Sequence, residues 1–354
     1  MAANMTAHRH HYAVIIGIKY YPGLTDLHSA LEDAKAFHRW VTTQGGVPTE
    51  NAKLILIDPA DFTDAIHAKP TKGEVTLALR EVNNAALILR ESSPLSWKET
   101  RLYFYLSGHG IALGGREAAL LMANWDEDAV AETIPCDMYL KTYEDCQFFH
   151  EVVVFADCCR NRKVAEFVGP GFPKPGTMVG KVKTFLGFAT QPEEAAYEPT
   201  NGMGDDARSY FTQALIEGLE GAAADPQTGE INSDTLARYL GQRVPKLTEH
   251  KKYRQIPQAF IDVITAPIVF RAPINGPVSR PKRKVTLNFP PTFGGTVDLY
   301  KDTQYCGSWR STEGPWALEL EDGLYKVKPS GATDGSGFRD NGLFEVTGDL
   351  NADL

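Results

Sequence analysis

Short, almost uninterrupted apolar runs alternate with amphipathic segments between residue 12 and about residue 266. Such runs are typical of strands buried on both faces, whereas apolar residues spaced three and four apart predict helices. The alternation therefore predicts an α/β domain, with a mostly parallel sheet and helices on both faces. Strands are expected at 12–18, 53–57, 101–106, 151–156, 183–189 and 258–263, and helices at 27–41, 72–90, 137–149, 210–219 and 233–244.

A different pattern begins after residue 266. Residues 267–281 contain four prolines and a glycine, which predicts a linker, and the basic run at 280–284 is interpreted as its solvated end. Beyond it, short alternating stretches separated by Gly, Pro and Asp predict a small all-β, sandwich-like domain. The expected organisation is a flexible tail at 1–11, a first domain at 12–266, the linker, and a β domain at 282–354.

Composition narrows the functional classes. The 354 residues carry a net charge of −9, so phosphate backbones would repel the chain and nucleic-acid binding is not expected. No run of about 18 apolar residues predicts a membrane span, and the polar N-terminus, with its three histidines, is interpreted as a tail rather than as a signal peptide or a metal site. Five cysteines without CxxC spacing favour neither a disulfide framework nor structural zinc. A reducing, cytoplasmic setting is expected.

Chemically reactive residues follow two of the predicted strands. The Ser-Gly-His-Gly sequence at 107–110, here named the histidine turn, follows one strand, and the Asp-Cys-Cys-Arg sequence at 157–160, the cysteine turn, follows another. Ligand sites of parallel sheets lie beyond the carboxyl ends of strands, and neighbouring strands are about 5 Å apart. His109 is therefore expected beside a thiol, as cysteine nucleophilic catalysis requires. The alternative is a structural histidine with buried, inert cysteines.

Glycines flank the predicted catalytic histidine. Gly108 and Gly110 have no side chain, which would let backbone amides approach a substrate closely. The backbone N–H groups of Gly110 and Cys159 are the candidates for an oxyanion hole.

The two turns resemble the histidine and cysteine motifs of the caspase–metacaspase family of cysteine peptidases. The interval between His109 and Cys159 fits the spacing of about 50 residues in caspases. Alignment on the Cys-Arg pair makes Cys159, rather than Cys158, the nucleophile. The resemblance covers about 12–266, and it implies a caspase-like, mostly parallel six-stranded sheet flanked by helices. Further matching segments are Asp33-Ala34, 188–198, 210–215 and 255–258.

The resemblance also implies a specificity. In the metacaspase-like branch the pocket contains two aspartates and the serine of the histidine turn, and these positions carry to Asp33, Asp157 and Ser107. Two carboxylates in a narrow pocket would select Arg or Lys. The alternatives are a solvent-facing helix residue for Asp33 and a turn cap for Asp157. The pocket cysteine of some metacaspases is replaced here by Ala30.

The sequence contains fewer indications of how the protein is activated and whether it binds a cofactor. In this family the loop after the nucleophile is often cut, which implies self-cleavage or cleavage by an upstream protease; basic residues in a loop are also ordinary solubility features. No cofactor is required by the sequence. Calcium activates many metacaspases, so the resemblance raises the question of a calcium site. The acidic stretch 126–128 lacks the spacing of a calcium-binding loop, and calcium binding is therefore not favoured. The basic residues of the candidate cleavage loop are Arg160, Arg162, Lys163, Lys174, Lys181 and Lys183.

The resulting hypothesis is a cysteine endopeptidase that cuts protein substrates after Arg or Lys. Two alternatives stay open: a catalytically silent binding module, and a peptidase that serves a recruiting β domain. For the latter, Tyr300, Trp309 and Trp316 would form either a recognition face or, as is more usual, a core. Bacterial relatives of this layout imply a role in signalling or defence-linked cell death.

Overall fold

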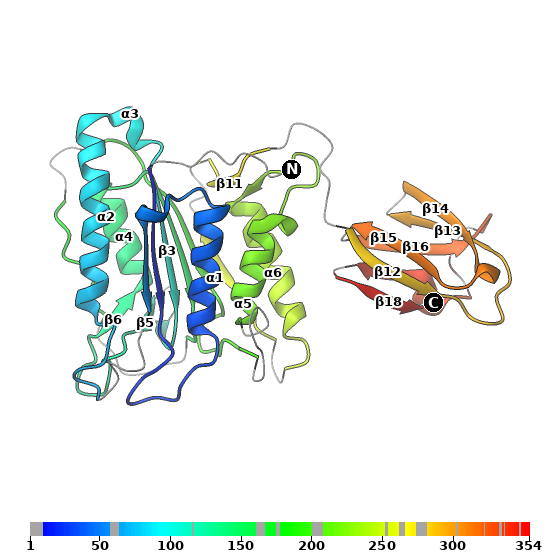
Figure 1. Cartoon of the computed structure of the whole chain (residues 1–354), viewed down its shortest axis with the longest axis horizontal. Helices are drawn as coiled ribbons and strands as arrows, with labels where there is room; N and C mark the ends of the chain where they lie inside the picture. The colour runs from blue at the N-terminus through cyan, green and yellow to red at the C-terminus, as the bar shows by residue number, and fades with distance from the viewer. Residues whose placement is uncertain are drawn as a thin grey trace. The chain divides into compact units, whose positions relative to one another are not determined.

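The computed structural model describes residues 10–56, 64–114, 117–160, 167–174, 178–199, 208–251, 254–261, 266–273, 282–301, 304–321, 323–332, 335, 337–346 and 348–354. The chain divides into two compact units, Met1–Asn275 and Gly276–Leu354. The first has layered helices and strands and the second is built of strands (Figure 1). Each unit has a hydrophobic core of its own.

The first unit is organised around a six-stranded sheet of order β10-β8-β7-β3-β1-β2. Five strands are parallel, and only β10 at one edge is antiparallel to its neighbour. This is the mostly parallel, six-stranded sheet that the resemblance implies. The strands are β1 (His11–Gly17), β2 (Ala52–Leu56), β3 (Arg101–Ser107), β7 (Glu151–Asp157), β8 (Lys183–Phe188) and β10 (Gln258–Ile261).

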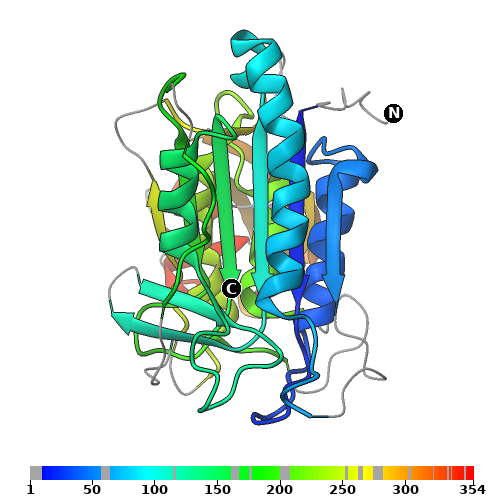
Figure 2. The same ribbon diagram turned by 90° about the vertical axis from the view of Figure 1, so that its left-hand side faces the viewer.

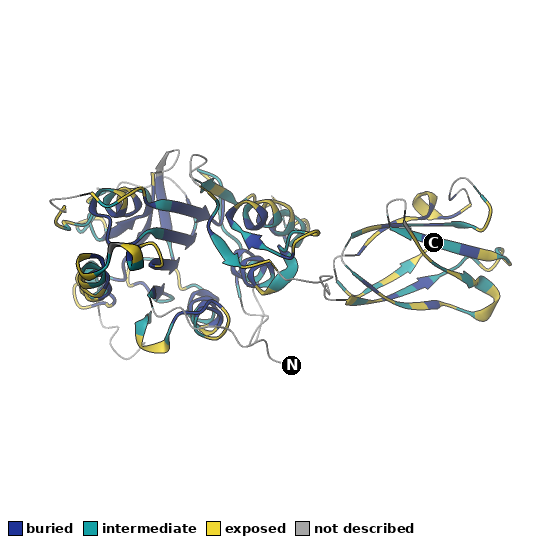
Figure 3. Cartoon of the chain, turned by 90° about the horizontal axis from the view of Figure 1, so that it is seen from above, coloured by how far each residue is buried: buried dark blue, intermediate teal, exposed yellow. Residues whose placement is uncertain are grey.

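Helices cover both faces of this sheet, as Figures 1 and 2 show. Alternate strand residues point to opposite faces, so Val14 packs in one core and Ile15 in the other. The four central strands, β1, β3, β7 and β8, are accordingly buried almost throughout, and the exposed residues lie on the outer sides of the helices (Figure 3). One face carries α2 (Lys72–Ser92), α3 (Pro94–Trp97) and α4 (Cys136–Cys146), and the other α1 (Ala30–Thr43), α5 (Tyr210–Glu217) with the π-helical turn η4 (Gly218–Ala222), and α6 (Ser233–Leu247).

Every predicted helix and strand of the first unit is present, with differences at the ends. Helix α4 stops at Cys146 because Gln147 adopts a left-handed conformation with φ of 50°. A second sheet of order β4-β5-β6 follows the histidine turn and is not predicted by the pattern. Its middle strand is rich in Ala and Leu, which are good helix formers, so tertiary packing overrides local propensity here. These strands are β4 (Gly110–Gly114), β5 (Glu117–Leu121) and β6 (Thr133–Pro135); a 3₁₀ turn, η1 (Thr49–Asn51), precedes β2.

The strand register brings three strand ends into one row. Gly17, Ser107 and Asp157 are successive Cα partners on β1, β3 and β7. A side chain on Gly17 would meet the Ala30 carbonyl at 2.6 Å, so glycine allows the first turn of α1 to pack directly on the end of β1. This contact carries Asp33, which lies in that turn, to the same edge of the sheet.

The linker begins later than the sequence pattern predicts, and the tail ends earlier. Ile268 is buried, and β11 (Val269–Arg271) pairs with β9 (Ile231–Asn232) of the first unit. The prediction of a linker from residue 267 is therefore wrong for the first residues of that segment, because prolines also tolerate edge strands. His11, expected in the tail, is buried in β1.

The second unit contains a three-stranded sheet, β15-β12-β18, and a four-stranded sheet, β14-β13-β16-β17. Trp316 is buried in its core, and Trp309 packs against that core and stacks on Trp316 with ring centroids 6.0 Å apart. The core interpretation therefore holds for these two tryptophans. The elements are β12 (Lys282–Asn288), β13 (Thr296–Lys301), β14 (Gln304–Arg310), η5 (Ser311–Glu313), β15 (Trp316–Glu321), β16 (Gly323–Pro329), η6 (Arg339–Gly342), β17 (Leu343–Val346) and β18 (Leu350–Asp353).

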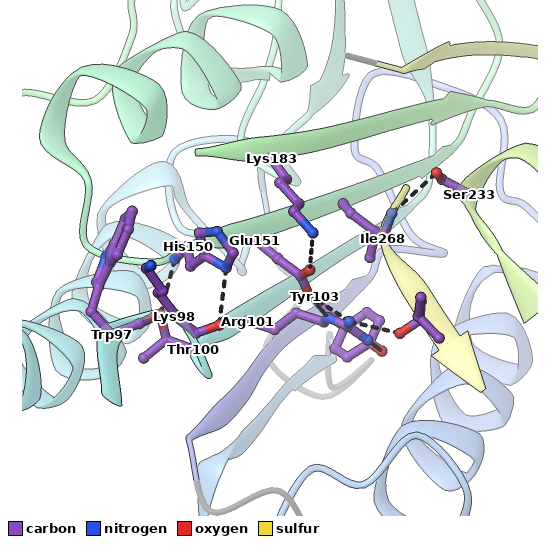
Figure 4. Close-up of polar contacts among 11 residues, drawn as sticks. Trp97, Lys98, Thr100, Arg101, Tyr103, His150, Glu151, Lys183, Ser233 and Ile268 are labelled. Carbon is purple, nitrogen blue, oxygen red and sulfur yellow. Dashed lines mark hydrogen bonds and ion pairs between the residues drawn. The ribbon is translucent and has the colours of Figure 1, made fainter. Parts of the chain in front are cut away.

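A buried ionic cluster lies at the amino ends of the central strands, at the edge opposite to the three strand ends described above (Figure 4). The Arg101 guanidinium donates to the Glu151 carboxylate, with Nε and Oε2 2.8 Å apart, and to the carbonyl of Val269 at 2.8 Å. Lys183 lies 3.4 Å from the other oxygen of Glu151. These contacts join β3, β7, β8 and β11.

Among the helices that the structure describes, none combines the length and the apolar character that crossing a membrane would need. None of the five cysteines, all of which lie within the described residues, forms a disulfide bond.

Candidate active site

The histidine and cysteine turns lie against each other at the carboxyl edge of the central sheet. Ser107 and Asp157 are Cα partners, and the Gly108 N–H donates to the Asp157 carbonyl at 3.3 Å. A Cβ on Gly110 would lie 2.4 Å from the Cys159 carbonyl oxygen and 2.5 Å from the Cys158 sulfur. The glycine predicted to admit a substrate thus has an additional role, because it lets the two turns pack together.

His109 is held from two sides by the segment after β1. Its Nε2 lies 2.6 Å from the Thr25 carbonyl oxygen, and its backbone N–H donates to the Tyr21 hydroxyl at 3.0 Å. The Tyr21 ring stands edge-on to the imidazole, with centroids 4.9 Å apart, and its hydroxyl donates to the Leu121 carbonyl. A carbonyl acceptor at Nε2 favours the tautomer that carries its proton there, which leaves Nδ1 able to accept one. Sequence reasoning missed Tyr21 and Thr25, which no motif marks.

The two cysteines differ in exposure. Cys158 is 1% exposed, and burial raises the pKa of its thiol well above the ordinary value. Cys159 is partly exposed, and its sulfur accepts the Ala196 N–H at 3.3 Å. Burial raises the pKa of the Cys159 thiol as well, and the charges of Asp157 and Glu198 add to that effect. In this conformation burial therefore favours the neutral thiol form of the accessible cysteine.

The segment around Ala196 runs along the cysteine turn. Arg160 N–H donates to the Glu194 carbonyl at 3.1 Å, and Glu193 N–H donates to the Arg160 carbonyl at 2.9 Å. The next residue after Ala196, Tyr197, donates its N–H to the Gln255 side chain at 2.8 Å. Backbone pairing therefore fixes this segment directly beside the Cys159 thiol.

A small pocket, here named the acidic pocket, adjoins Cys159. It has a cavity volume of about 60 Å³ and draws its walls from α1, β3, the cysteine turn, the 196–198 segment and the start of α5. All three residues of the predicted specificity pocket lie in its lining together with the candidate nucleophile. Its lining residues are Leu27, Ser29, Ala30, Asp33, Ser107, Gly108, Asp157, Cys158, Cys159, Ala196, Tyr197, Glu198 and Ser209.

Hydrogen bonds orient the two aspartates of the acidic pocket. Asp33 accepts the Ser209 N–H at 2.8 Å on one oxygen and the Ser107 hydroxyl at 3.3 Å on the other. Asp157 accepts the hydroxyls of Ser209 and Thr212 on Oδ2, the latter at 2.6 Å. Asp33 is therefore not a solvent-facing helix residue, because its side chain is completely buried and directed at the sheet edge.

Burial controls the charge of both aspartates. Desolvation raises the pKa of Asp33 well above its usual range, and the neighbouring Asp157 adds to that rise. Desolvation likewise raises the pKa of Asp157 to about 6, although the hydroxyls of Ser209 and Thr212 oppose it. Two buried carboxylates without a cation are expected to hold protons more tightly than free ones. A cation that entered the pocket would reverse this shift.

Glu198 and Ser209 are pocket residues that sequence reasoning missed. The Glu198 carboxylate accepts the backbone N–H of Ser29 at 2.8 Å and of His28 at 2.9 Å, so it lies at the amino end of α1. Ser209 is the N-cap of α5. A Ser-x-x-Thr sequence before an apolar helix was the available signal for the cap, but neither contact follows from local sequence.

The six basic residues of the predicted cleavage loop have different environments. Arg160 is completely buried and Lys183 begins β8, so both belong to the folded core, and a protease could not reach Arg160. This corrects the expectation for them, which rested on composition alone. Lys174 and Lys181 are exposed, and Lys174 pairs with Asp145 at 2.7 Å. Arg162 and Lys163 lie outside the described residues.

The described residues offer no group of three or more His, Cys, Asp or Glu side chains that could hold a metal ion. In the acidic stretch 126–128, the Asp126 side chain accepts the backbone N–H groups of Asp128 and Ala129, at 2.9 and 2.7 Å. This carboxylate thus forms an ordinary turn cap.

The comparison with protein-family models identifies the family of the first unit. The family model of the caspase domain, Peptidase_C14, matches residues 10–266. Two solved structures are similar: caspase-1 from Spodoptera frugiperda, at 15% identity over 78% of this chain and 96% of that chain with a TM-score of 0.48, and pro-sf-caspase-1, at 14% identity over 75% and 92% with a TM-score of 0.45. No curated protein matches the sequence.

Proposed function

This chain belongs to the caspase-domain family of peptidases, and we propose that it is an active cysteine endopeptidase that cleaves protein substrates after arginine or lysine. The observation that carries the proposal is the acidic pocket, in which Asp33 and Asp157 lie beside the partly exposed Cys159. A narrow cavity lined by two carboxylates can bind the side chain of an arginine or lysine. The carbonyl of that same residue would then lie beside the Cys159 nucleophile.

Cys159 and His109 are the proposed catalytic pair. The Cys159 sulfur attacks the scissile carbonyl carbon and forms an S–C bond, while its proton passes to Nδ1 of His109. The Thr25 carbonyl at Nε2 supports this direction, because it favours the tautomer of the neutral imidazole whose proton is on Nε2 and whose Nδ1 carries none. The imidazolium then protonates the leaving amine as the C–N bond breaks, and water hydrolyses the thioester with His109 as base.

The backbone N–H groups of Gly110 and Cys159 are the proposed oxyanion donors. The close packing of Gly110 on the cysteine turn supports this assignment, since it brings the two amides into the same small region. Backbone donors fixed in this way stabilise negative charge as it develops on the carbonyl oxygen.

Charge selects the residue before the scissile bond. Asp33, Asp157 and Glu198 all line the pocket, and a positive side chain would neutralise carboxylates whose burial disfavours ionisation. Arginine is favoured over lysine, because a planar guanidinium can pair with two carboxylates at once. An acidic side chain at this position would be repelled.

The resting site requires a change before it acts. Burial raises the pKa of the Cys159 thiol, and the Ala196 N–H donates to its sulfur. Substrate binding, or cleavage of the chain after the cysteine turn by this enzyme or an upstream protease, would displace the 193–198 segment. The exposed Lys174 and Lys181 are the described candidates for that cut. Intact mass spectrometry after incubation tests this step, and an uncut chain with full activity would overturn it.

Peptide-library profiling tests the proposed function, with and without calcium and with Cys159→Ala as control. We expect the strongest cleavage after Arg, weaker cleavage after Lys, and none with the control.

Asp157→Asn, which keeps the shape of the side chain, is expected to reduce kcat/KM for Arg peptides by about 100-fold or more, as removal of one partner of a buried charge pair does. Profiles without preference for basic residues would refute the specificity, and a chain that an arginine-directed covalent probe never labels would refute the activity.

A further inference from the structure

Helix α5 begins directly behind the acidic pocket, and its first turn is bonded to both aspartates. Ser209 donates its backbone N–H to Asp33 and its hydroxyl to Asp157, so one residue bridges the two carboxylates. Thr212, one turn on, donates its hydroxyl to the same oxygen of Asp157 at 2.6 Å. Ser209 is 4% exposed and Thr212 is completely buried, so solvent does not compete for these bonds.

A third hydroxyl extends this arrangement into the sheet. The Tyr105 hydroxyl on β3 is hydrogen-bonded to Thr212 Oγ1. Because the single hydroxyl proton of Thr212 goes to Asp157, the proton between Tyr105 and Thr212 must come from Tyr105. The Ser209 hydroxyl in turn accepts the Thr212 N–H at 3.1 Å. The whole chain of donors therefore points toward Asp157 Oδ2.

We propose that Ser209 and Thr212 are positioning residues for specificity: their hydroxyls hold Asp157 ionised and fix its Oδ2, so that Oδ1 faces a guanidinium. This inference rests on the proposed function and deepens it. Hydrogen bonds from hydroxyls stabilise a carboxylate over a carboxylic acid, and chains of such bonds strengthen one another. Their effect is needed here, because desolvation and nearby negative charge both disfavour the ionised form.

The charged and titratable groups around Asp157 come from several elements. Asp33 lies on α1, Glu198 on the segment that crosses the cysteine turn, Tyr105 on β3, and Cys159 two residues farther along the chain. The carboxylates of Asp33 and Glu198 oppose the charge of Asp157, and no cation lines the acidic pocket among the described residues. Hydroxyls and backbone amides are therefore the groups on which the ionised form of Asp157 depends.

The test is the pH dependence of kcat/KM for a peptide with Arg before the scissile bond, in wild type and Thr212→Val. Valine keeps the shape and removes the hydroxyl. We expect the acidic limb of the profile to move to higher pH by about one unit, with KM at pH 6 raised by about fivefold, and the two enzymes to agree within about twofold at pH 8.5. Thr212→Ser should restore the wild-type profile, and Gln213→Ala, on the same helix, should leave it unchanged.

Two further variants protect the test against a folding defect. Ser209→Ala should shift the limb in the same direction, and Tyr105→Phe, which removes the outermost donor, should shift it less. A loss of kcat/KM by the same factor at all pH values, shared between a lower kcat and a higher KM, would overturn the inference and indicate damage to the fold. If the wild type is active and the acidic limb of the pH profile is unchanged in Thr212→Val and Ser209→Ala, the inference about these hydroxyls is overturned while the proposed function stands. A wild type that cleaves no basic substrate would overturn both.

Discussion

The guanidinium carbon of Arg160 lies 4.2 Å from the ring centroid of Phe188. Arg160 follows the candidate nucleophile and Phe188 ends β8, so this contact fastens the cysteine turn to the neighbouring strand. The guanidinium also donates to the Thr190 carbonyl at 3.1 Å and to the Gln258 side chain on β10 at 2.7 Å. The position of Cys159 therefore depends on a buried cation that takes no part in the chemistry.

Replacement of Arg160 by lysine is expected to destabilise the first unit and to lower activity. Lysine keeps the charge but has neither the planar group that stacks on Phe188 nor the fork that reaches two acceptors. We expect a loss of about 2–4 kcal/mol in the free energy of unfolding, measured by urea titration, and a fall in kcat rather than a change of specificity. Lys35→Ala is the matched control, since its ion pair with Glu32 is exposed. Equal stability of Arg160→Lys and wild type would contradict this role.

Asp157→Asn is expected to stabilise the fold at neutral pH while it impairs cleavage after arginine. The pKa of Asp157 is about 6 in the folded chain, above its ordinary value of 3.8. As pH rises from 4 to about 6, the unfolded chain loses its proton first, so stability falls and then levels off. Removal of the charge would restore up to about 3 kcal/mol above pH 6, and nothing near pH 4.

Thermal unfolding of Asp157→Asn at pH 4.0 and 7.5 measures this difference. A rise in Tm of about 2–4 °C for each kcal/mol is expected at the higher pH only. Asp145→Asn is a suitable control, because Lys174 lowers the pKa of that exposed carboxyl and the sign of any effect is reversed. A Tm that falls equally at both pH values would show that lost hydrogen bonds outweigh the relieved charge.

The sequence predicts the part of this site that follows from strand order. Ser107 and Asp157 end buried parallel strands, and parallel register is enough to place them side by side. Ser209, Glu198 and Tyr21 are a different case, because each lies in a cap or a loop whose position depends on packing between elements distant in the chain. Local composition also misleads about which residues are accessible. Arg160 is a basic residue beside a loop with further basic residues, yet its side chain is completely buried in the core.

The two adjacent cysteines give opposite expectations. Cys159→Ala should abolish peptide hydrolysis, whereas Cys158→Ala should retain most of it, because Cys158 is buried beneath Gly110 and burial raises the pKa of its thiol well above the ordinary value. Covalent labelling with an arginine-directed probe, followed by peptide mapping, identifies which cysteine is modified. Hydrolysis that survives in Cys159→Ala and disappears in Cys158→Ala would show that the alignment is displaced by one residue.

The buried ionic cluster at the opposite sheet edge is expected to control stability rather than specificity (Figure 4). Arg101→Met would leave the Glu151 carboxylate buried, with Lys183 as its one remaining ion-pair partner among the described residues, and we expect a loss of about 3–5 kcal/mol in urea unfolding. The double variant Arg101→Met with Glu151→Met should recover most of that loss, because no uncompensated acid remains. Lys35→Met, at an exposed pair, is the control. The argument fails if the double variant is no more stable than the single one.

Truncation after Pro281 should separate catalysis from recruitment. The first unit has its own two cores and the second unit a third, so loss of the β domain should leave kcat/KM for a short peptide within about twofold and the main unfolding transition in place. If the β domain recruits substrates, cleavage of a whole protein should fall. Trp316 is in the core, which leaves Tyr300 and Tyr305, Cα partners on β13 and β14, as the aromatic pair to replace in the full chain. Equal cleavage of a whole protein by both forms would argue against recruitment, because a domain that binds substrate must change KM for the substrate it binds.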